Sequence, residues 1–344
     1  MLVSAKWKGV SVALGMWLIA GALAGCAADT GASAPRRIAV DARPNGIAVR
    51  PGAGTLFIAD DATDSVLSAP DGRGFTRFAA LPPVAGQDRN SLSELVFADP
   101  RLLLVARFGF GTAGALIALV PQDGGPPRIT TFSGPDPARR RLGLAVLAPG
   151  QVLSTWFVKS GNAPQYGGLS LLTYDAATAR ATEQDWLTGL QKPVGVAVAG
   201  GNVYVSDEAG NRILKARIDA LRAAPQPASA ATVVARIDGP DLLAASHDGT
   251  LYTKCGKTGF CKIAADGTVT QIADDFHDAR GVALDETRGV LYVIDRAKEA
   301  KTPRGADPKD ANSTNHMHSN PDRNPDSTQA TPRGTSEVRV LPLR

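Results

Sequence analysis

The chain has 344 residues, of which 44% are hydrophobic and only 6% aromatic, and its formal net charge is +4. This length and apolar content suffice for a sizeable core, which small and β-branched side chains must mostly fill. Basic residues are scattered, apart from the run Arg139-Arg140-Arg141, which we expect to be a solvated loop. Without a concentrated basic face, the sequence excludes a nucleic-acid-binding protein.

The first 25 residues have the layout of an export signal. Lys6 and Lys8 form a basic start, residues 9–25 hold no charged side chain, and the stretch ends in Leu23-Ala24-Gly25-Cys26. An apolar run of this length is short for a membrane span and ends in small residues, as cleaved signals do. An ordinary secretory signal with an incidental cysteine is the alternative.

The ending resembles the lipobox of bacterial lipoproteins, whose cysteine becomes the lipidated N-terminus. The resemblance implies lipidation of Cys26 and a protein anchored to the bacterial envelope. Ala27 after the cysteine favours the outer membrane, with the protein facing the periplasm. Residues 26–35 are small and polar, so we expect a flexible tether there.

From Arg36 onward one unit recurs six times: a turn of small residues, an apolar run, a hairpin, and a second apolar run that ends near an acid. The clearest copies span Pro44 to Asp60, Pro193 to Asp207 and Arg280 to Asp295. Strand-like repeats of this size predict a propeller or a solenoid. The apolar runs are near-continuous, which is typical of strands buried on both faces.

Two positions in the unit stay in step, 12 to 14 residues apart in every copy. The first is a glycine or its equivalent, at Gly46, Ser93, Gly143, Gly195, Leu242 and Gly281. The second closes the second run, at Asp60, Arg107, Trp156, Asp207, Cys255 and Asp295. Each copy has room for four strands, so we predict an all-β, six-bladed β-propeller over residues 36–344.

The last copy lacks its fourth strand, and Arg36–Asp41 is left without a blade. We predict that this N-terminal strand pairs with the last blade and closes the ring, which leaves only short, protected sheet edges. Residues 297–334 are polar and almost devoid of apolar side chains, so we expect a disordered insertion in the last blade. The insertion contains His316 and His318, which either chelate a soft metal or are plain loop residues.

Cys255 and Cys261 are the two cysteines that remain after Cys26. In an exported protein such a pair predicts a disulfide, here across a short hairpin. The acids Asp60, Asp207 and Asp295 recur at one position of the unit, so we expect them to brace turns rather than to catalyse.

The segment Asp207-Glu-Ala-Gly-Asn211-Arg-Ile-Leu214 resembles the NHL repeat, and the chain is similar in outline to gluconolactonase and regucalcin-like propellers. In that family a Glu, an Asn in a Pro-Asn-Gly turn and an Asp in a Pro-Asp-Gly turn hold a divalent metal at the axis. Asn45 and Asp241 occupy related turns here, so the resemblance implies an axial Ca²⁺ on those two residues. The family's Glu-Gly-Pro-x-Trp signature is absent, and both residues could simply cap turns.

The chain also resembles sugar dehydrogenase propellers that bind a quinone cofactor, but His247 and His277 do not fit a base at the axis. Our principal hypothesis is therefore an envelope-anchored, monomeric binding protein. Its central face would take a small molecule or an envelope protein, and no cofactor is certain. The alternative is a Ca²⁺-dependent lactone or ester hydrolase. For the axial pocket the sequence suggests Asn45, Asp241, Arg280, Arg107 and Trp156.

Overall fold

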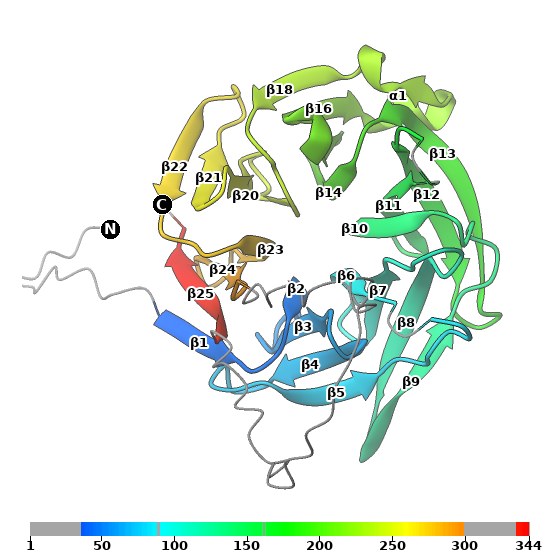
Figure 1. Ribbon diagram of the computed structural model, residues 1–344, viewed down its shortest axis with the longest axis vertical. Coiled ribbons are helices and arrows are strands. Elements are labelled where there is room, and N and C mark those ends of the chain that lie inside the picture. The colour runs from blue at the N-terminus through cyan, green and yellow to red at the C-terminus, as the bar shows by residue number, and fades with distance from the viewer. Residues whose placement is uncertain (1–35, 88–89, 160, 162, 299–334, 344) are drawn as a thin grey trace, which may run out of the picture. The chain divides into compact units, whose positions relative to one another are not determined.

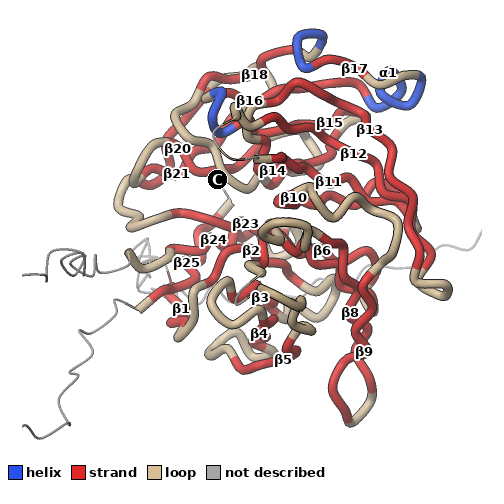
Figure 2. Tube along the Cα trace, turned by 45° about the vertical axis from the view of Figure 1, so that its right-hand side comes forward, coloured by secondary structure: helices blue, strands red, loops and turns tan. Residues whose placement is uncertain are grey.

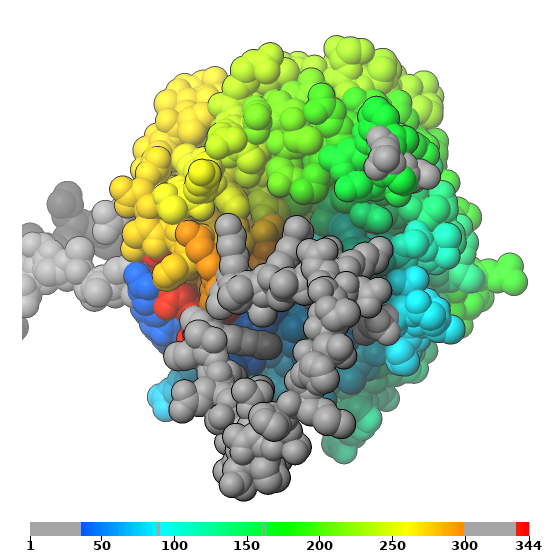
Figure 3. All heavy atoms as spheres, viewed as in Figure 1, coloured from blue at the N-terminus to red at the C-terminus, as the bar shows by residue number. Residues whose placement is uncertain are grey.

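Six antiparallel sheets are arranged as blades around a central axis (Figure 1). The computed structural model describes residues 36–87, 90–159, 161, 163–298 and 335–343. The export signal, Cys26, the tether, His316, His318 and most of the predicted insertion therefore lie outside the described residues. In the space-filling view the blades follow one another around the molecule in chain order (Figure 3).

The first three blades are built from consecutive strands, each running from the axis outward. Blade 1 contains β2 (Pro44–Val49), β3 (Leu56–Asp60), β4 (Ser65–Ala69) and β5 (Thr76–Ala80). Blade 2 contains β6 (Leu92–Asp99), β7 (Leu102–Arg107), β8 (Ala115–Gln122) and β9 (Gly125–Thr131). Blade 3 contains β10 (Arg140–Ala148), β11 (Gln151–Val158), β12 (Tyr166–Asp175) and β13 (Arg180–Leu190), to which the short β17 (Gln226–Pro227) adds a parallel pairing.

The other three blades complete the ring. Blade 4 contains β14 (Pro193–Ala199), β15 (Asn202–Asp207), β16 (Arg212–Arg217) and β18 (Thr232–Arg236). Blade 5 contains β19 (Ala244–Ala245), β20 (Leu251–Cys255), β21 (Gly259–Ile263) and β22 (Val269–Ala273). Blade 6 contains β23 (Ala279–Asp285), β24 (Val290–Asp295), β25 (Ser336–Pro342) and, from the other end of the chain, β1 (Arg36–Val40).

Ring closure follows the prediction from the sequence. β1 pairs antiparallel with β25, with Arg36 opposite Val340 and Val40 opposite Ser336. The N-terminal strand thus becomes the outer strand of the last blade, and the six-bladed propeller is confirmed. The first and last strands of the domain therefore hold each other in place through their hydrogen bonds.

Helices are few. A 3₁₀ turn (Glu208–Gly210) follows β15, and the link from β16 to β18 contains helix α1 (Ile218–Ala223) and a second 3₁₀ turn (Ala228–Ala230). The last two lie at the outer edge of the ring, beside blades 3 and 4 (Figure 2). Within the described residues, no helix is long and apolar enough to cross a membrane.

Among the described residues the core has seven apolar clusters, of which six lie one between each pair of neighbouring blades and the seventh lies at the axis. β7 shows how one strand serves two of them. Leu103 and Val105 pack toward blade 1, whereas Leu104 and Ala106 pack toward blade 3. Because successive side chains point to opposite faces of a sheet, a strand buried on both faces needs apolar residues at every position. The near-continuous apolar runs of the repeat follow from this.

A disulfide joins Cys255, at the end of β20, to Cys261 in β21, with 5.8 Å between the two Cα atoms. It ties together the two middle strands of blade 5 at their hairpin. Blade 5 has the shortest inner strand, β19, and its copy of the repeat has Leu242 in place of the glycine. The disulfide therefore reinforces blade 5, whose copy of the repeat lacks the glycine.

Candidate functional site

A pocket of about 390 Å³ opens at the end of the axis where the inner strands begin. The residue just before the repeat glycine lines it in five of the six blades, namely Asn45, Leu142, Val194, Asp241 and Arg280. In blade 2 the corresponding Leu92 is fully buried, and Ser93 takes its place in the lining. The structure thus brings the axial positions singled out in the sequence together around one pocket. Residues at the ends of the second strands and after them complete the lining, namely Phe108, Phe157, Lys159, Gln165, Glu208 and Arg296.

The backbone of the ring is fixed by hydroxyl groups on the second strands. Ser206 Oγ accepts the Gly195 N–H at 2.7 Å and donates to the Asp241 carbonyl of the next blade at 2.6 Å. The Asp241 N–H in turn donates to Thr253 Oγ1 at 3.2 Å. Since buried hydroxyls of this kind satisfy backbone groups that the strand ladder leaves unpaired, they hold neighbouring inner strands in register at the pocket.

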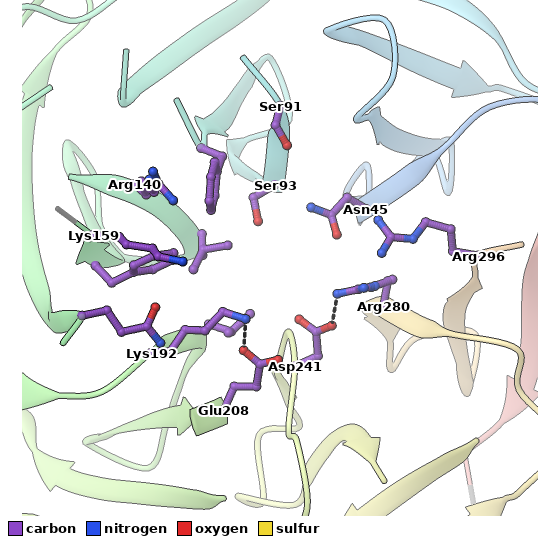
Figure 4. A pocket seen from close by; sticks show the side chains of 15 residues that line it. Asn45, Ser91, Ser93, Arg140, Lys159, Lys192, Glu208, Asp241, Arg280 and Arg296 are labelled. Atoms are coloured by element: carbon purple, nitrogen blue, oxygen red, sulfur yellow. Dashed lines mark hydrogen bonds and ion pairs between the residues drawn. The ribbon is translucent and has the colours of Figure 1, made fainter. Parts of the chain in front are cut away.

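Asp241 and Arg280 form an ion pair at the centre of the pocket (Figure 4). Arg280 Nη1 lies 2.9 Å from Asp241 Oδ2, and Arg280 Nε lies 2.9 Å from Asp278 Oδ2. Asp278 also pairs with Arg296 and Lys254. Burial opposes ionisation of Asp278, yet Arg280, Lys254 and Arg296 together hold its pKa down at about 2. This side of the pocket is a network of mutually compensated charges.

The opposite side is apolar and carries cations whose charge is not compensated. Phe108 and Phe157 pack edge to face, with ring centroids 5.7 Å apart. The Arg140 guanidinium lies over both rings, at 5.5 and 5.7 Å from their centroids. Lys159 lies close by (Figure 4). Among the described residues neither Arg140 nor Lys159 has a carboxylate partner, whereas Lys192 on the same side is paired with Glu208.

The pocket as a whole is therefore positively charged. Five cationic side chains line it, Arg140, Lys159, Lys192, Arg280 and Arg296, against two acidic ones, Glu208 and Asp241. Asp278 also binds Arg280 and Arg296 from behind, so the uncompensated charge is that of Arg140 and Lys159. A concave site with a surplus of one charge raises the local concentration of ligands of the opposite sign. The electrostatics favour an anion.

Two polar groups at the top of the pocket complete the site. Ser93 is 1% exposed, and within the described part of the chain its Oγ has no hydrogen-bond partner. Asn45 lies beside it and donates from Nδ2 to the Leu92 carbonyl at 2.9 Å (Figure 4). A buried hydroxyl without a partner costs free energy unless a water or a ligand satisfies it. Ser93 thus marks a point where a bound molecule can place a polar group.

Arg107 and Trp156 do not line the pocket, although they close second strands as Asp207 does. Arg107 Nε donates to the Ala113 carbonyl at 2.8 Å, and Trp156 Nε1 donates to Ser170 Oγ at 2.6 Å. Both side chains are more than nine-tenths buried. They are directed into the blades, where they support the connections, rather than toward the axis.

The arginine run that the sequence suggested to be a solvated loop is instead part of the blade 3 framework. Arg141 is fully buried and binds Glu183 at 2.7 Å, while Arg139 binds Asp185 at 2.5 Å and lies 3.8 Å above the Trp156 ring. Only Arg140, between them, faces the pocket. Because alternate residues of a strand point to opposite sides, the outer two arginines are pulled into the blade and present the middle one to the ligand.

A divalent metal does not fit the residues as they are arranged. Asp241 receives hydrogen bonds on both oxygens, from Arg280 Nη1 on Oδ2 and from its neighbour's backbone, Leu242 N–H, on Oδ1 at 3.0 Å. In the described part of the chain no group of three or more His, Cys, Asp or Glu side chains could hold a metal ion. Ca²⁺ sites in proteins use six to eight oxygen ligands, several of them carboxylates. The pair Asn45 and Asp241 falls short of such a set.

No histidine lines the pocket within the described residues. His277 donates its N–H to Asp295, and the side chains of His277 and His247 are 65% and 86% exposed. A general base must lie within reach of the bound substrate. The resemblance to quinone-dependent dehydrogenases therefore has no support at this site.

Below the pocket, the inner strands enclose an apolar channel that contains one carboxyl group, that of Glu94. Glu94 is 7% exposed, and its Oε1 accepts the Leu95 N–H at 3.3 Å. Burial, reinforced by the charge of Asp241, raises the pKa of Glu94 well above its usual value. The native state therefore holds this proton more tightly than the unfolded chain does.

This shift predicts a stability that falls as the pH rises. Below the ordinary pKa of a glutamate the contribution of Glu94 is fully present, and it is lost as the pH rises toward the elevated value in the folded protein. Glu94→Gln, which stays neutral, is expected to have a higher free energy of unfolding than the wild type at pH 8, by a margin that grows from pH 5 to pH 8. Urea unfolding at pH 5, 6, 7 and 8 measures the difference, with Asp123→Asn on an exposed turn as control. Parallel pH curves for wild type and Glu94→Gln would contradict the prediction.

Comparison with known proteins shows the fold alone. No protein-family model and no curated protein matches the sequence. Among solved structures, a luciferin-regenerating enzyme superposes with a TM-score of 0.62 at 13% identity, covering 90% of this chain and 96% of that one. A calcium-binding regucalcin from Agrobacterium tumefaciens gives 0.58 at 14% identity over 89% and 92%. A gluconolactonase from Xanthomonas campestris gives 0.57 at 16% over 75% and 86%. The chain is a six-bladed propeller with the fold of regucalcin- and gluconolactonase-like proteins.

Proposed function

We propose that the central pocket binds a small amphipathic anion. The observation that carries the proposal is the wall formed by Arg140 over Phe108 and Phe157, together with the pocket residue Lys159. Neither cation has a carboxylate partner among the described residues. A carboxylate or phosphate group would bind the two cations. The apolar body of the ligand would pack on the aromatic rings and on the neighbouring Leu142.

The wall is suited to this task because the aromatic rings hold the guanidinium in place. A cation over a ring face is attracted by the ring quadrupole, so Arg140 is oriented before the ligand arrives. Arginine also offers two parallel N–H donors to a carboxylate or phosphate. The far end of the ligand would reach Ser93 Oγ, the buried hydroxyl that lacks a partner in the described structure.

The proposal extends to the cellular setting on the sequence alone. Lipidation of Cys26 would hold the propeller at the bacterial envelope, in a periplasm-facing position, with residues 26–35 as a tether. In that setting the protein would capture its ligand from the periplasm. The small-molecule ligand is favoured over an envelope protein because the charged wall lies inside a pocket of about 390 Å³.

Isothermal titration calorimetry with benzoate, phenyl phosphate, benzyl alcohol and benzamidine tests the proposal. The two anions are expected to bind and the neutral and cationic analogues are not. Arg140→Gln and Lys159→Gln should each weaken binding about 10- to 100-fold, the usual range for a lost charge-assisted hydrogen bond. The matched control is Arg128→Gln, an exposed arginine on the outer strand β9. Equal binding of benzyl alcohol, or an Arg140→Gln variant that binds benzoate like the wild type, would contradict it.

A lactone or ester hydrolase is the second candidate. It is favoured by the fold likeness to a gluconolactonase and by the presence of Asn45 and Asp241 in one pocket. It ranks second because the Asp241 carboxylate is already engaged by Arg280. A screen of sugar and aryl lactones with Ca²⁺ and with a chelator tests it: turnover that Asp241→Asn abolishes would support the hydrolase, and no turnover under either condition would exclude it.

A further inference from the structure

We propose that Arg280 determines which charge the axial pocket accepts, because its guanidinium occupies the place at Asp241 that a divalent cation would need. Proteins of this fold include a calcium-binding regucalcin. In this chain a side chain of the protein itself supplies the positive charge. The inference concerns exclusion of metal and does not depend on the ligand proposed above.

The contacts of Asp241 leave no carboxylate oxygen without a donor. Arg280 Nη1 lies 2.9 Å from Oδ2, and the Leu242 N–H lies 3.0 Å from Oδ1. Asp241 is 7% exposed, so water replaces these donors only with difficulty. A metal ion would have to displace Arg280 to reach Oδ2.

Arg280 is also bound by a second carboxylate, that of Asp278. Its Nε donates to Asp278 Oδ2 at 2.9 Å, and Asp278 also receives Arg296 Nη2 at 3.0 Å and Lys254 Nζ at 2.8 Å. The Asp278 backbone N–H is bound by Asp295 Oδ1 at 3.1 Å. Moving the guanidinium away from Asp241 would break one part of a partly buried ion-pair network, and isolated charges left in such surroundings are costly.

The other charged residues of the ring also disfavour a bound cation. Of the residues just before the repeat glycine, Asp241 is the one acid, and Arg280 is its neighbour in the next blade. Arg296 adds a further positive charge to the lining. A divalent cation at Asp241 would gain a single carboxylate beside the Arg280 guanidinium, because the nearby Asp278 is already engaged by Arg280, Arg296 and Lys254. Hard cations instead bind where carboxylates outnumber cations.

The prediction can be tested with Ca²⁺ alone as the titrant. In isothermal titration calorimetry and thermal-shift measurements the wild type is expected to show no saturable Ca²⁺ binding. Arg280→Met removes the charge but keeps an apolar stem, and should bind Ca²⁺ saturably, with a Kd at least tenfold below the highest Ca²⁺ concentration at which the wild type shows no binding. Adding Asp241→Asn to this variant should abolish the gain. Arg280→Lys, which keeps a positive charge, should remain unresponsive.

The control is Arg288→Met. The exposed Arg288 pairs with the buried Asp285 at 2.6 Å, and neither residue lines the pocket. The substitution therefore breaks a similar pair away from the pocket and should leave Ca²⁺ binding unchanged. Circular dichroism checks that each variant is folded. Saturable Ca²⁺ binding by the wild type that Asp241→Asn abolishes would overturn the inference, even if no Arg280 variant folds. A folded Arg280→Met that gains nothing, or a gain in Arg280→Lys equal to that in Arg280→Met, would overturn it as well.

Discussion

Gly46→Ala is expected to lower the free energy of unfolding by about 3 kcal/mol or more, the upper range for overpacking a core. A Cβ atom at this position would lie 2.2 Å from the Ser93 carbonyl oxygen and 2.8 Å from the Glu94 Cα. Both are backbone atoms of β6, the inner strand of the next blade. Since a strand backbone cannot rotate aside as a side chain does, blades 1 and 2 would have to separate near the axis.

The same close approach recurs around the ring, and it explains the glycine of the repeat. A Cβ atom on Gly143, Gly195 or Gly281 would meet backbone in, or just before, the next blade's inner strand at 2.5, 2.6 and 2.6 Å. The six inner strands converge on the axis, where too little space remains for a side chain on this face. Glycine at this position is therefore required by packing in blades 1, 3, 4 and 6.

Gly125→Ala is the matched control for Gly46→Ala. Gly125 begins β9, an outer strand, and a Cβ atom there would meet nothing within 4 Å. Urea unfolding of the two variants beside the wild type gives the comparison, and the alanine at Gly125 is expected to change stability by less than about 0.5 kcal/mol. A Gly46→Ala protein as stable as Gly125→Ala would mean that the blades can separate at no cost, and would refute the packing argument.

The fold could be predicted from the sequence because the axis imposes the same demand on every blade. The glycine, the apolar runs and the closing acid each answer a repeated physical problem, so they recur in step along the chain. Even the copies without the glycine form blades: Ser93 stands at its place in blade 2 and Leu242 in blade 5. Blade 5 then has an inner strand of two residues, and Thr253 Oγ1 donates to the Leu242 carbonyl at 2.9 Å.

The site could be predicted only where it coincides with the repeat. Asn45, Asp241 and Arg280 occupy the position before the glycine, and the sequence pointed to them for that reason. Arg140 lies three residues before Gly143 and Lys159 follows β11, so both lie outside that position. The orientation of Arg140 depends on Glu183 and Asp185, which bind the flanking arginines, and on Phe108 from the preceding blade. Such long-range contacts leave no spacing signal in the sequence.

The closing acids connect the repeat to the pocket, and Asp207 shows how. Its Oδ1 accepts the N–H groups of Gln191 and Lys192 at 3.0 and 2.9 Å, just before β14 begins. In blade 6, Asp295 accepts the N–H groups before β23 in the same way. Lys192 lines the pocket. By binding its backbone N–H, the acid that closes the second strand also fixes the backbone position of a pocket residue. The turn-bracing role expected from the sequence agrees with these contacts.

Asp207→Ala is therefore expected to lower the free energy of unfolding by about 2–4 kcal/mol, because it removes the acceptor of two part-buried backbone N–H groups, at about 1–2 kcal/mol for each. Asp207 is fully buried, and Arg212 would also lose its carboxylate partner at 2.9 Å. Urea unfolding at neutral pH measures the loss, with the exposed Asp123→Ala as control.

Asp207→Asn separates the two contributions. Its side-chain carbonyl can still accept the Gln191 and Lys192 N–H groups, while the charge that pairs with Arg212 is gone. Because Arg212 is partly exposed, its ion pair should contribute little, and Asn is expected to retain more than half of the stability that Ala loses. If Asn and Ala are equally destabilising, the ion pair rather than the backbone bracing dominates at this position. The backbone contact recurs in blade 1, where Asp60 accepts the Arg43 N–H at the equivalent strand entry. Equal destabilisation by Asn and Ala would mean that this contact does not explain why the acid recurs.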